Sequence, residues 1–206
     1  DTRYVRREKR IAEGDTFVKF GRNLESIVNQ LLSFSAETNP KTQADVVQCD
    51  VLSEPEIGPV HLVVCSPPYP NAYSYHLYHR SRMLWLGMDP GLFKKCEIGS
   101  HRKYSCKGEN AANADTFRRE LDTILTWLKT KVQKDRHVCF VIGDSTIAGK
   151  VIRNDSILAD SAKACGYRIE ANIGRSLLGT KKYFNPKIGK IRDEKIVILR
   201  NSSWQM

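Results

Sequence analysis

Two periodicities of apolar positions run along this chain and predict an alternation of helices and strands. Helical spacing, with apolar residues three and four apart, occurs in residues 15–35, 117–132 and 157–165. Continuous apolar runs at 61–65 and 138–142 are typical of strands covered on both faces. Weaker patterns predict further strands at 45–50, 167–173 and 195–199. Residues 70–112 are expected to form a mixture of helix and loop.

Buried strands that alternate with amphipathic helices predict an α/β domain with a largely parallel sheet. We expect residues 1–44 to form a basic segment and a helix, and residues 45–201 to form the main domain. Within it, 70–112 is a candidate substrate-recognition insertion, and 202–206 is a tail.

Composition narrows the class of protein. The chain is 41% hydrophobic and 27% charged, which is ordinary globular usage and excludes a wholly disordered or fibrous chain. No apolar run approaches the roughly 20 residues of a membrane-spanning helix, and the first residues lack the apolar core of a signal peptide. We therefore expect a soluble, cytoplasmic protein without a membrane partner.

The formal net charge of +10 changes this picture, because the basic residues are clustered. The clusters at 3–10, 94–107 and 181–192 each lie beside aromatic residues, a combination that favours a polyanionic partner. Charge alone does not distinguish DNA, RNA and a merely solvated basic surface.

The six cysteines do not predict a metal or disulfide framework. None forms a Cys-x-x-Cys pair, and the spacing of Cys96, His101 and Cys106 does not match usual zinc sites. Cys65, Cys139 and Cys165 lie in or beside apolar runs. We expect reduced, mostly structural thiols and no metal.

The most informative segment is Ser66-Pro67-Pro68-Tyr69, directly after the apolar run 61–65. Ligands of open α/β sheets bind at the carboxyl ends of strands. Two prolines make a stiff turn with free carbonyl acceptors, while the serine adds a hydroxyl and the tyrosine a flat ring. This set suits a planar substrate that carries an amine; the alternative is an ordinary strand-to-loop turn.

This tetrapeptide resembles the catalytic motif of S-adenosylmethionine-dependent DNA amino-methyltransferases, which methylate exocyclic amines of bases. The serine form is most associated with cytosine-N4 enzymes, and Asp or Asn in its place with adenine-N6 enzymes. The resemblance covers roughly 45–201, through Gln48-Cys49-Asp50, Tyr69–His76, Arg80-Ser81-Arg82, Leu84–Gly87, Val141–Ser145 with Gly149, and Arg192–Leu199.

The resemblance implies direct methyl transfer from S-adenosylmethionine to an amine of a flipped base. The implied catalytic residues are Ser66, Pro67, Pro68 and Tyr69, with oxygens of Ser66 and Pro67 holding the amine and Tyr69 stacking on the base. Cys65 is expected to be core rather than a nucleophile. The implied cofactor contacts are Asp50, Cys49 and Ser66, and the implied substrate contacts are Asn71, Tyr73, Tyr75, Arg80, Lys181 and Lys182.

One element of the family is missing from this sequence. Its cofactor motif is a glycine-rich turn after the first strand, and no Gly-x-Gly occurs here. In the family the motif-bearing strand pairs with the catalytic strand, which would otherwise be bare at a sheet edge. We therefore expect the motif on a partner chain or on a trimmed segment, and the basic run at 3–10 favours an N-terminal one. A third alternative is a non-catalytic remnant.

The sequence thus favours the catalytic half of a DNA amino-methyltransferase, with cytosine N4 ahead of adenine N6. An RNA base methyltransferase and a nucleic-acid-binding subunit without activity are the alternatives. The recognition sequence stays open, as does a role in restriction–modification, regulation or defence.

Overall fold

The structure is a computed structural model, and it describes residues 12–71, 73–106, 111–176 and 193–202. The chain divides into two compact units, Asp1–Gln48 and Cys49–Met206, which are considered separately. None of the helices in the described part of the chain combines the length and the apolar composition that crossing a bilayer requires.

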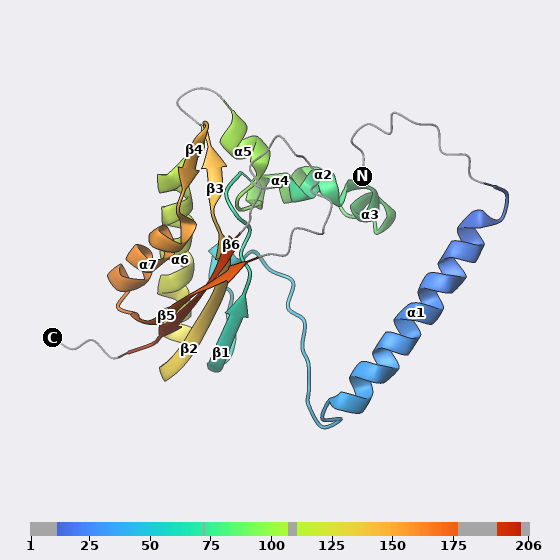
Figure 1. Cartoon of the computed structure of the whole chain (residues 1–206), viewed down its shortest axis with the longest axis horizontal. Coiled ribbons are helices and arrows are strands. Elements are labelled where there is room, and N and C mark those ends of the chain that lie inside the picture. The colour runs from blue at the N-terminus through green and yellow to red at the C-terminus, as the bar shows by residue number, and fades with distance from the viewer. Residues whose placement is uncertain (1–11, 72, 107–110, 177–192, 203–206) are drawn as a thin grey trace. The chain divides into compact units, whose positions relative to one another are not determined.

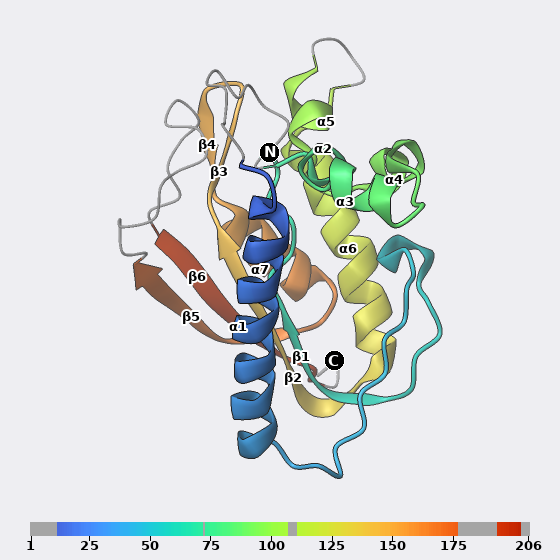
Figure 2. The same cartoon turned by 90° about the vertical axis from the view of Figure 1, so that its right-hand side faces the viewer.

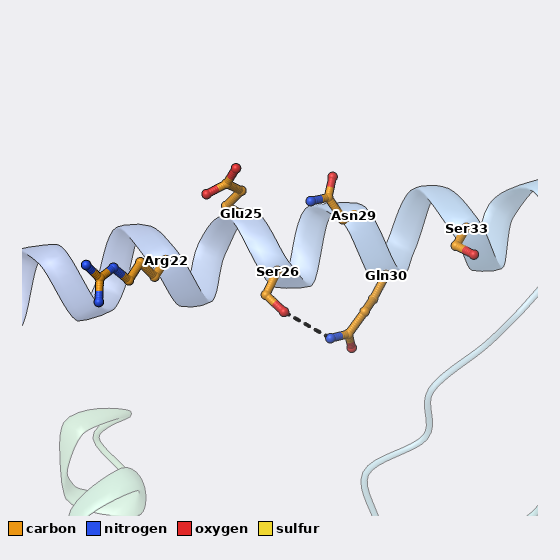
Figure 3. Close-up of a pocket in the computed structure, with 6 residues that line it drawn as sticks. All are labelled: Arg22, Glu25, Ser26, Asn29, Gln30 and Ser33. Atoms are coloured by element: carbon orange, nitrogen blue, oxygen red, sulfur yellow. Dashed lines mark hydrogen bonds between the residues drawn. The ribbon is translucent and has the colours of Figure 1, made fainter.

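The described residues of the first unit, 12–48, contain one helix, α1 (Asp15–Glu37), which confirms the helix predicted from spacing over 15–35. Its N-cap, Gly14, has a left-handed φ of 77°. The helix is strongly amphipathic, and it buries none of its residues. A shallow polar hollow of about 470 Å³ follows the hydrophilic face, where Gln30 donates to Ser26 at 3.1 Å (Figure 3).

The second unit is built on a four-stranded sheet in the order β1-β2-β6-β5. Its strands are β1 (Val60–Cys65), β2 (Val132–Gly143), β5 (Arg168–Ser176) and β6 (Asp193–Arg200). Only β1 and β2 are parallel, whereas β6 is antiparallel to both of its neighbours. The prediction of a largely parallel sheet was therefore wrong. β6 lies between β2 and β5 and runs antiparallel to both, and the direction of a short apolar strand is not set by its own residues.

Helices α6 (Ala114–Lys131) and α7 (Asn154–Ala164) lie side by side on one face of this sheet (Figure 1). Their positions confirm the helices predicted over 117–132 and 157–165. An Asn113–Thr116 capping box starts α6, and Gly166, with a φ of 77°, follows α7. The main buried core lies between these helices and the sheet, and includes Phe117, Leu121, Leu125, Val138, Phe140, Leu158, Val197 and Leu199.

The other face of the sheet is less well covered. Leu62 and Val64 of β1 are 57% and 71% exposed, and Ile173 of β5, on the same face, is also exposed. The prediction that strand 61–65 is covered on both faces was wrong, because both helices pack on the side of Val63 and Cys65. β1 is also an edge strand, and among the described residues only β2 pairs with it.

Two further segments differ from the prediction. Residues 45–50 form no strand, because an extended segment needs a hydrogen-bonding neighbour and no described strand pairs with them. A short 3₁₀ helix, η1 (Val51–Ser53), follows instead. The hairpin of β3 (Ser145–Ile147) and β4 (Lys150–Ile152) was not predicted; it turns at Ala148 and Gly149, which both have positive φ.

The described residues of the segment after β1 (70–71, 73–106 and 111–112) form a mixture of short helices and loops, as predicted for 70–112. The helices are α2 (Tyr75–Tyr78), α3 (Arg80–Trp85), α4 (Pro90–Cys96) and α5 (His101–Ser105). They lie together near the β3–β4 end of the second unit, as Figures 1 and 2 show from two sides.

Candidate active site

The Ser66-Pro67-Pro68-Tyr69 turn begins where β1 ends, at one edge of the sheet. Cys65 is in register with Phe140 of the parallel β2, which ends at Gly143. The antiparallel β6 starts beside Gly143, with Glu194 as its register partner. Ends of three strands therefore meet at the turn, where Ser66 is exposed and both prolines are half-buried. This is the edge at which ligands bind in open α/β sheets.

Tyr69 is fixed at both its ring and its hydroxyl. The ring packs against the core, and the hydroxyl donates to Glu194 Oε1 at 3.0 Å and lies 3.3 Å from the carbonyl oxygen of Val141. Burial raises the pKa of the Tyr69 phenol to about 12, with the Ser66 hydroxyl opposing this shift and Glu194 adding to it. Tyr69 is therefore a neutral donor near pH 7, and its ring is held in one orientation.

Glu194 is a site residue that sequence reasoning did not assign. Its second oxygen accepts from Arg175 at 2.5 Å, so the carboxylate bridges the end of β5 and Tyr69. The sequence signal that could have indicated Glu194 is an acidic residue at the start of an apolar strand. What could not be foreseen is that β6 lies antiparallel beside β2, which brings Glu194 to the turn.

Gly99 supports the turn from behind and was also missed. It has a left-handed φ of +70°, and a Cβ built on it would lie 2.9 Å from the Tyr69 carbonyl oxygen and 3.2 Å from the Pro68 carbonyl carbon. The Gly99 carbonyl also accepts from the Asn71 amide at 3.1 Å. Only glycine fits both the conformation and the close approach.

Asn71, predicted to contact the substrate, makes several hydrogen bonds within the protein. It has a positive φ of 62°, and its Nδ2 donates to the Thr146 carbonyl of β3 at 2.5 Å. Its Oδ1 accepts from Ser105, and its carbonyl oxygen lies 3.2 Å from Nδ1 of His101. Asn71 thus ties the turn to the β3–β4 hairpin and to α5.

The predicted substrate residues Tyr73 and Tyr75 lie together, with ring centroids 5.8 Å apart. Tyr73 is 41% exposed, and burial is the main cause of the raised pKa of Tyr75. The backbone here is anchored by buried Glu97, which accepts from the Tyr75 amide and, at 2.5 Å, contacts Nδ1 of buried His76. The two tyrosines are therefore presented from a well-supported loop.

A polar cavity of about 340 Å³ opens at the same edge of the sheet. Its lining does not include the Ser66–Tyr69 turn, but it includes Arg175, the partner of Glu194. Asp144 also lines it; its pKa is raised by burial, which the nearby Arg153 partly offsets. The lining residues are Asp144, Arg153, Gly174, Arg175, Ser176, Asp193 and Lys195.

The predicted cofactor residues Asp50 and Cys49 are both exposed, just before η1. Asp50 caps this short helix, and its Oδ1 accepts from the Leu52 amide at 3.0 Å. That leaves its other oxygen for a ligand amine. The sequence, however, has no Gly-x-Gly turn to cradle the rest of the cofactor. These residues alone therefore do not make a complete S-adenosylmethionine site.

The remaining predicted residues fall in different places. Arg80 is exposed at the start of α3, while Lys181 and Lys182 lie outside the described residues. Cys65 packs against the core, and burial raises the pKa of its thiol, which disfavours a thiolate nucleophile. Its expected structural role agrees with this environment.

No family profile matches the chain, and no curated protein matches it in sequence. Solved structures of TTHA0409, a candidate DNA modification methylase from Thermus thermophilus, are similar. The first is 19% identical with a TM-score of 0.44, and covers 77% of this chain and 54% of its own.

Two further structures of the same protein give similar values. A selenomethionine derivative is 18% identical with a TM-score of 0.42, covering 76% of this chain and 50% of its own. A complex with S-adenosyl-L-methionine is 19% identical with a TM-score of 0.43, covering 76% and 55%. The chain thus spans about half the length of these proteins.

Proposed function

We propose that this chain is the catalytic half of a DNA amino-methyltransferase, which transfers a methyl group from S-adenosylmethionine to the exocyclic amine of a flipped base. The observation that carries the proposal is the Ser66–Tyr69 turn at the carboxyl end of β1. There an exposed serine hydroxyl lies beside a tyrosine ring that Glu194 holds in place.

In the proposed site, the turn binds and orients the amine. The Ser66 hydroxyl and the Pro67 carbonyl oxygen accept the two amine hydrogens, and neither proline offers a competing backbone donor. Holding both hydrogens biases the nitrogen away from conjugation with the ring, which makes its lone pair more nucleophilic. The Tyr69 ring stacks on the base, while its hydroxyl remains bonded to Glu194. Positioning is then the main source of rate enhancement.

The cofactor would supply an electrophilic methyl group on its sulfonium, and its binding site is incomplete in this chain. We propose that a second segment or partner chain carries the glycine-rich turn and the strand before it. Three observations support this. β1 pairs with a single strand among the described residues; Leu62 and Val64 of its outer face are exposed; and the sequence lacks Gly-x-Gly. A strand added at the free edge of β1 would bring that turn beside Ser66.

The substrate follows from the chemistry of the turn and from the charge. A net charge of +10 favours a nucleic acid, and the serine form of the motif favours cytosine N4 over adenine N6. Within a duplex the amine is paired, so the base has to be flipped out, at a cost of a few kcal/mol. RNA methylation is the second candidate, because the basic clusters do not distinguish the two nucleic acids.

The experiment is methyl transfer from labelled S-adenosylmethionine to duplex DNA and to RNA. The chain is assayed alone and mixed with a segment that carries the glycine motif, and products are identified as nucleosides by mass spectrometry. We expect N4-methylcytosine in DNA from the mixture only, with loss of turnover in Ser66→Ala. Turnover by folded Ser66→Ala at the wild-type rate would refute the site. Binding of DNA without cofactor binding in any mixture would indicate a non-catalytic subunit.

A further inference from the structure

The connection between α3 and α4 exposes a compact apolar tip. Trp85, the last residue of α3, is 90% exposed, and its neighbours Leu84 and Leu86 are 57% and 71% exposed. Solvating three adjacent large apolar side chains is costly, and an exposed apolar cluster of this kind marks an interaction site. We call Leu84-Trp85-Leu86 the apolar tip.

The tip is held rigidly. After Leu86, the Gly87 amide donates to Leu84 at 3.2 Å and the Met88 amide donates to Met83 at 2.8 Å, which is a Schellman C-cap with Gly87 at a φ of +71°. Met83 itself is buried and anchors the helix end. The side chain of Trp85 is thus presented from an ordered helix terminus, and ordering it on binding costs little additional backbone entropy.

The surroundings of the tip are basic. Between residues 73 and 106 there are six Lys and Arg against two acids, Asp89 and Glu97. Glu97 is buried against His76, and Asp89 caps α4 through the Gly91 amide. The exposed charges on the two helices beside the tip are therefore mainly positive: Arg80 and Arg82 on α3, and Lys94 and Lys95 on α4. This charge is complementary to the phosphates of a nucleic acid.

The tip belongs to the same supported loop system as the catalytic turn. Glu97, at the end of α4, accepts from the Tyr75 amide, and the His101 amide donates to the Tyr73 carbonyl at 2.9 Å. Gly99 lies between these two anchors, in contact with the backbone of Pro68 and Tyr69. The turn and the helices that carry the tip are therefore joined by one connected set of backbone contacts.

We propose that the apolar tip is a wedge that inserts Trp85 into the base stack of duplex DNA, next to the flipped base. Arg80 and Arg82 contact the adjacent phosphates. The inference rests on the proposed function, since a base extruded into the catalytic turn leaves a gap in the stack. A flat apolar side chain can fill such a gap and offset part of the cost of unstacking.

The test is tryptophan fluorescence of the full chain, in a Trp204→Phe background, with a duplex of about 25 base pairs that contains one abasic site. Trp127 provides an internal reference, because it is buried and donates Nε1 to the Pro55 carbonyl at 3.1 Å. We expect strong quenching from Trp85, tighter binding to the abasic duplex than to an intact one, and about tenfold weaker binding of Trp85→Ala. Trp85→Phe should retain most of the affinity.

Two controls separate stacking from charge and from folding. Val151→Ala removes apolar surface from a residue that is 67% exposed on β4, and should bind as the wild type does. Arg82→Gln should lower the salt dependence of binding by about one phosphate contact, whereas Trp85→Ala should leave that dependence unchanged. Far-UV circular dichroism checks that each variant is folded.

Each other outcome overturns the wedge or the function on which it rests. Binding of DNA without quenching, together with unchanged affinity of Trp85→Ala, would refute insertion and leave the proposed methyl transfer intact. A chain that binds no duplex, but self-associates until Trp85→Asp is introduced, would make the tip a protein interface. Conversely, quenching and wedge-dependent affinity without methyl transfer in the completed enzyme would refute the proposed function and retain the wedge as a DNA contact.

Discussion

Replacing Gly99 by alanine tests whether the Ser66–Tyr69 turn, the proposed catalytic turn, depends on close packing against the Gly99 backbone. A left-handed φ of +70° costs an alanine about 1–2 kcal/mol relative to glycine. The added methyl would also lie 2.9 Å from the Tyr69 carbonyl oxygen and 3.1 Å from its carbonyl carbon. These are backbone atoms that cannot rotate away, so overpacking adds ~1–3 kcal/mol. We expect Gly99→Ala to lose about 2–5 kcal/mol in total, by adding the two ranges.

Gly149→Ala is the matched control. Its φ of +78° carries the same conformational cost, but nothing lies within 4 Å of the added methyl. Urea unfolding, followed by circular dichroism with one shared m-value, measures both losses. Gly149→Ala should lose only about 1–2 kcal/mol. Equal losses in the two variants would refute the claim that Gly99 packs against the turn, and a folded Gly99→Ala enzyme with wild-type turnover would refute the importance of that contact for catalysis.

Three further predictions follow from the same contacts. The raised pKa of Tyr69 keeps the phenol protonated in the folded state, so its stabilising contribution is present below pH 10 and is lost as pH rises through about 12. The free energy of unfolding, measured from about pH 9 to about pH 12, should therefore fall less steeply in Tyr69→Phe than in the wild type. Parallel curves for the two proteins would contradict this. Glu97→Ala removes the acceptor of the Tyr75 amide and the partner of buried His76, and should lower the free energy of unfolding in urea by about 3–5 kcal/mol. A loss below ~1 kcal/mol would show that the Glu97–His76 pair is dispensable for stability. Val64→Lys on the edge strand β1 should reduce concentration-dependent self-association of the isolated chain, measured by sedimentation, while Val151→Lys, of similar exposure, should not. An equal effect of the two substitutions would argue against self-association through β1.

Local patterns predicted most of the elements but not how they pair. The helix over 15–35, the helices on the sheet and the strands at 61–65 and 138–142 were all visible as periodic or continuous apolar positions. These signals are local, because burial of a face imposes its own spacing. The direction of β6 is not encoded in its own residues, since a short apolar run is compatible with either orientation in a sheet. For that reason the largely parallel sheet was predicted wrongly.

In the candidate site too, the contiguous residues could be predicted from the sequence, whereas the residues brought in by tertiary structure could not. The turn itself could be predicted, because Ser66-Pro67-Pro68-Tyr69 is contiguous and follows an apolar strand. Glu194 and Gly99 could not, because they reach Tyr69 only through the pairing of β6 with β2 and through the loop after α4. The strand expected at 45–50 did not form because no described strand lies beside it to accept its hydrogen bonds. That outcome agrees with the proposal that a second segment or partner chain supplies a further strand.

The most direct test of the account is the identity of the methylated nucleoside when the chain is completed by a segment with the glycine-rich turn. Duplex DNA is incubated with labelled S-adenosylmethionine, digested and analysed by mass spectrometry, for the wild type and for Ser66→Ala. The account predicts label on the exocyclic amine of cytosine, with N6 of adenine as the second choice, and none with the variant. Label at carbon 5 of cytosine, or label that persists in Ser66→Ala, would contradict it.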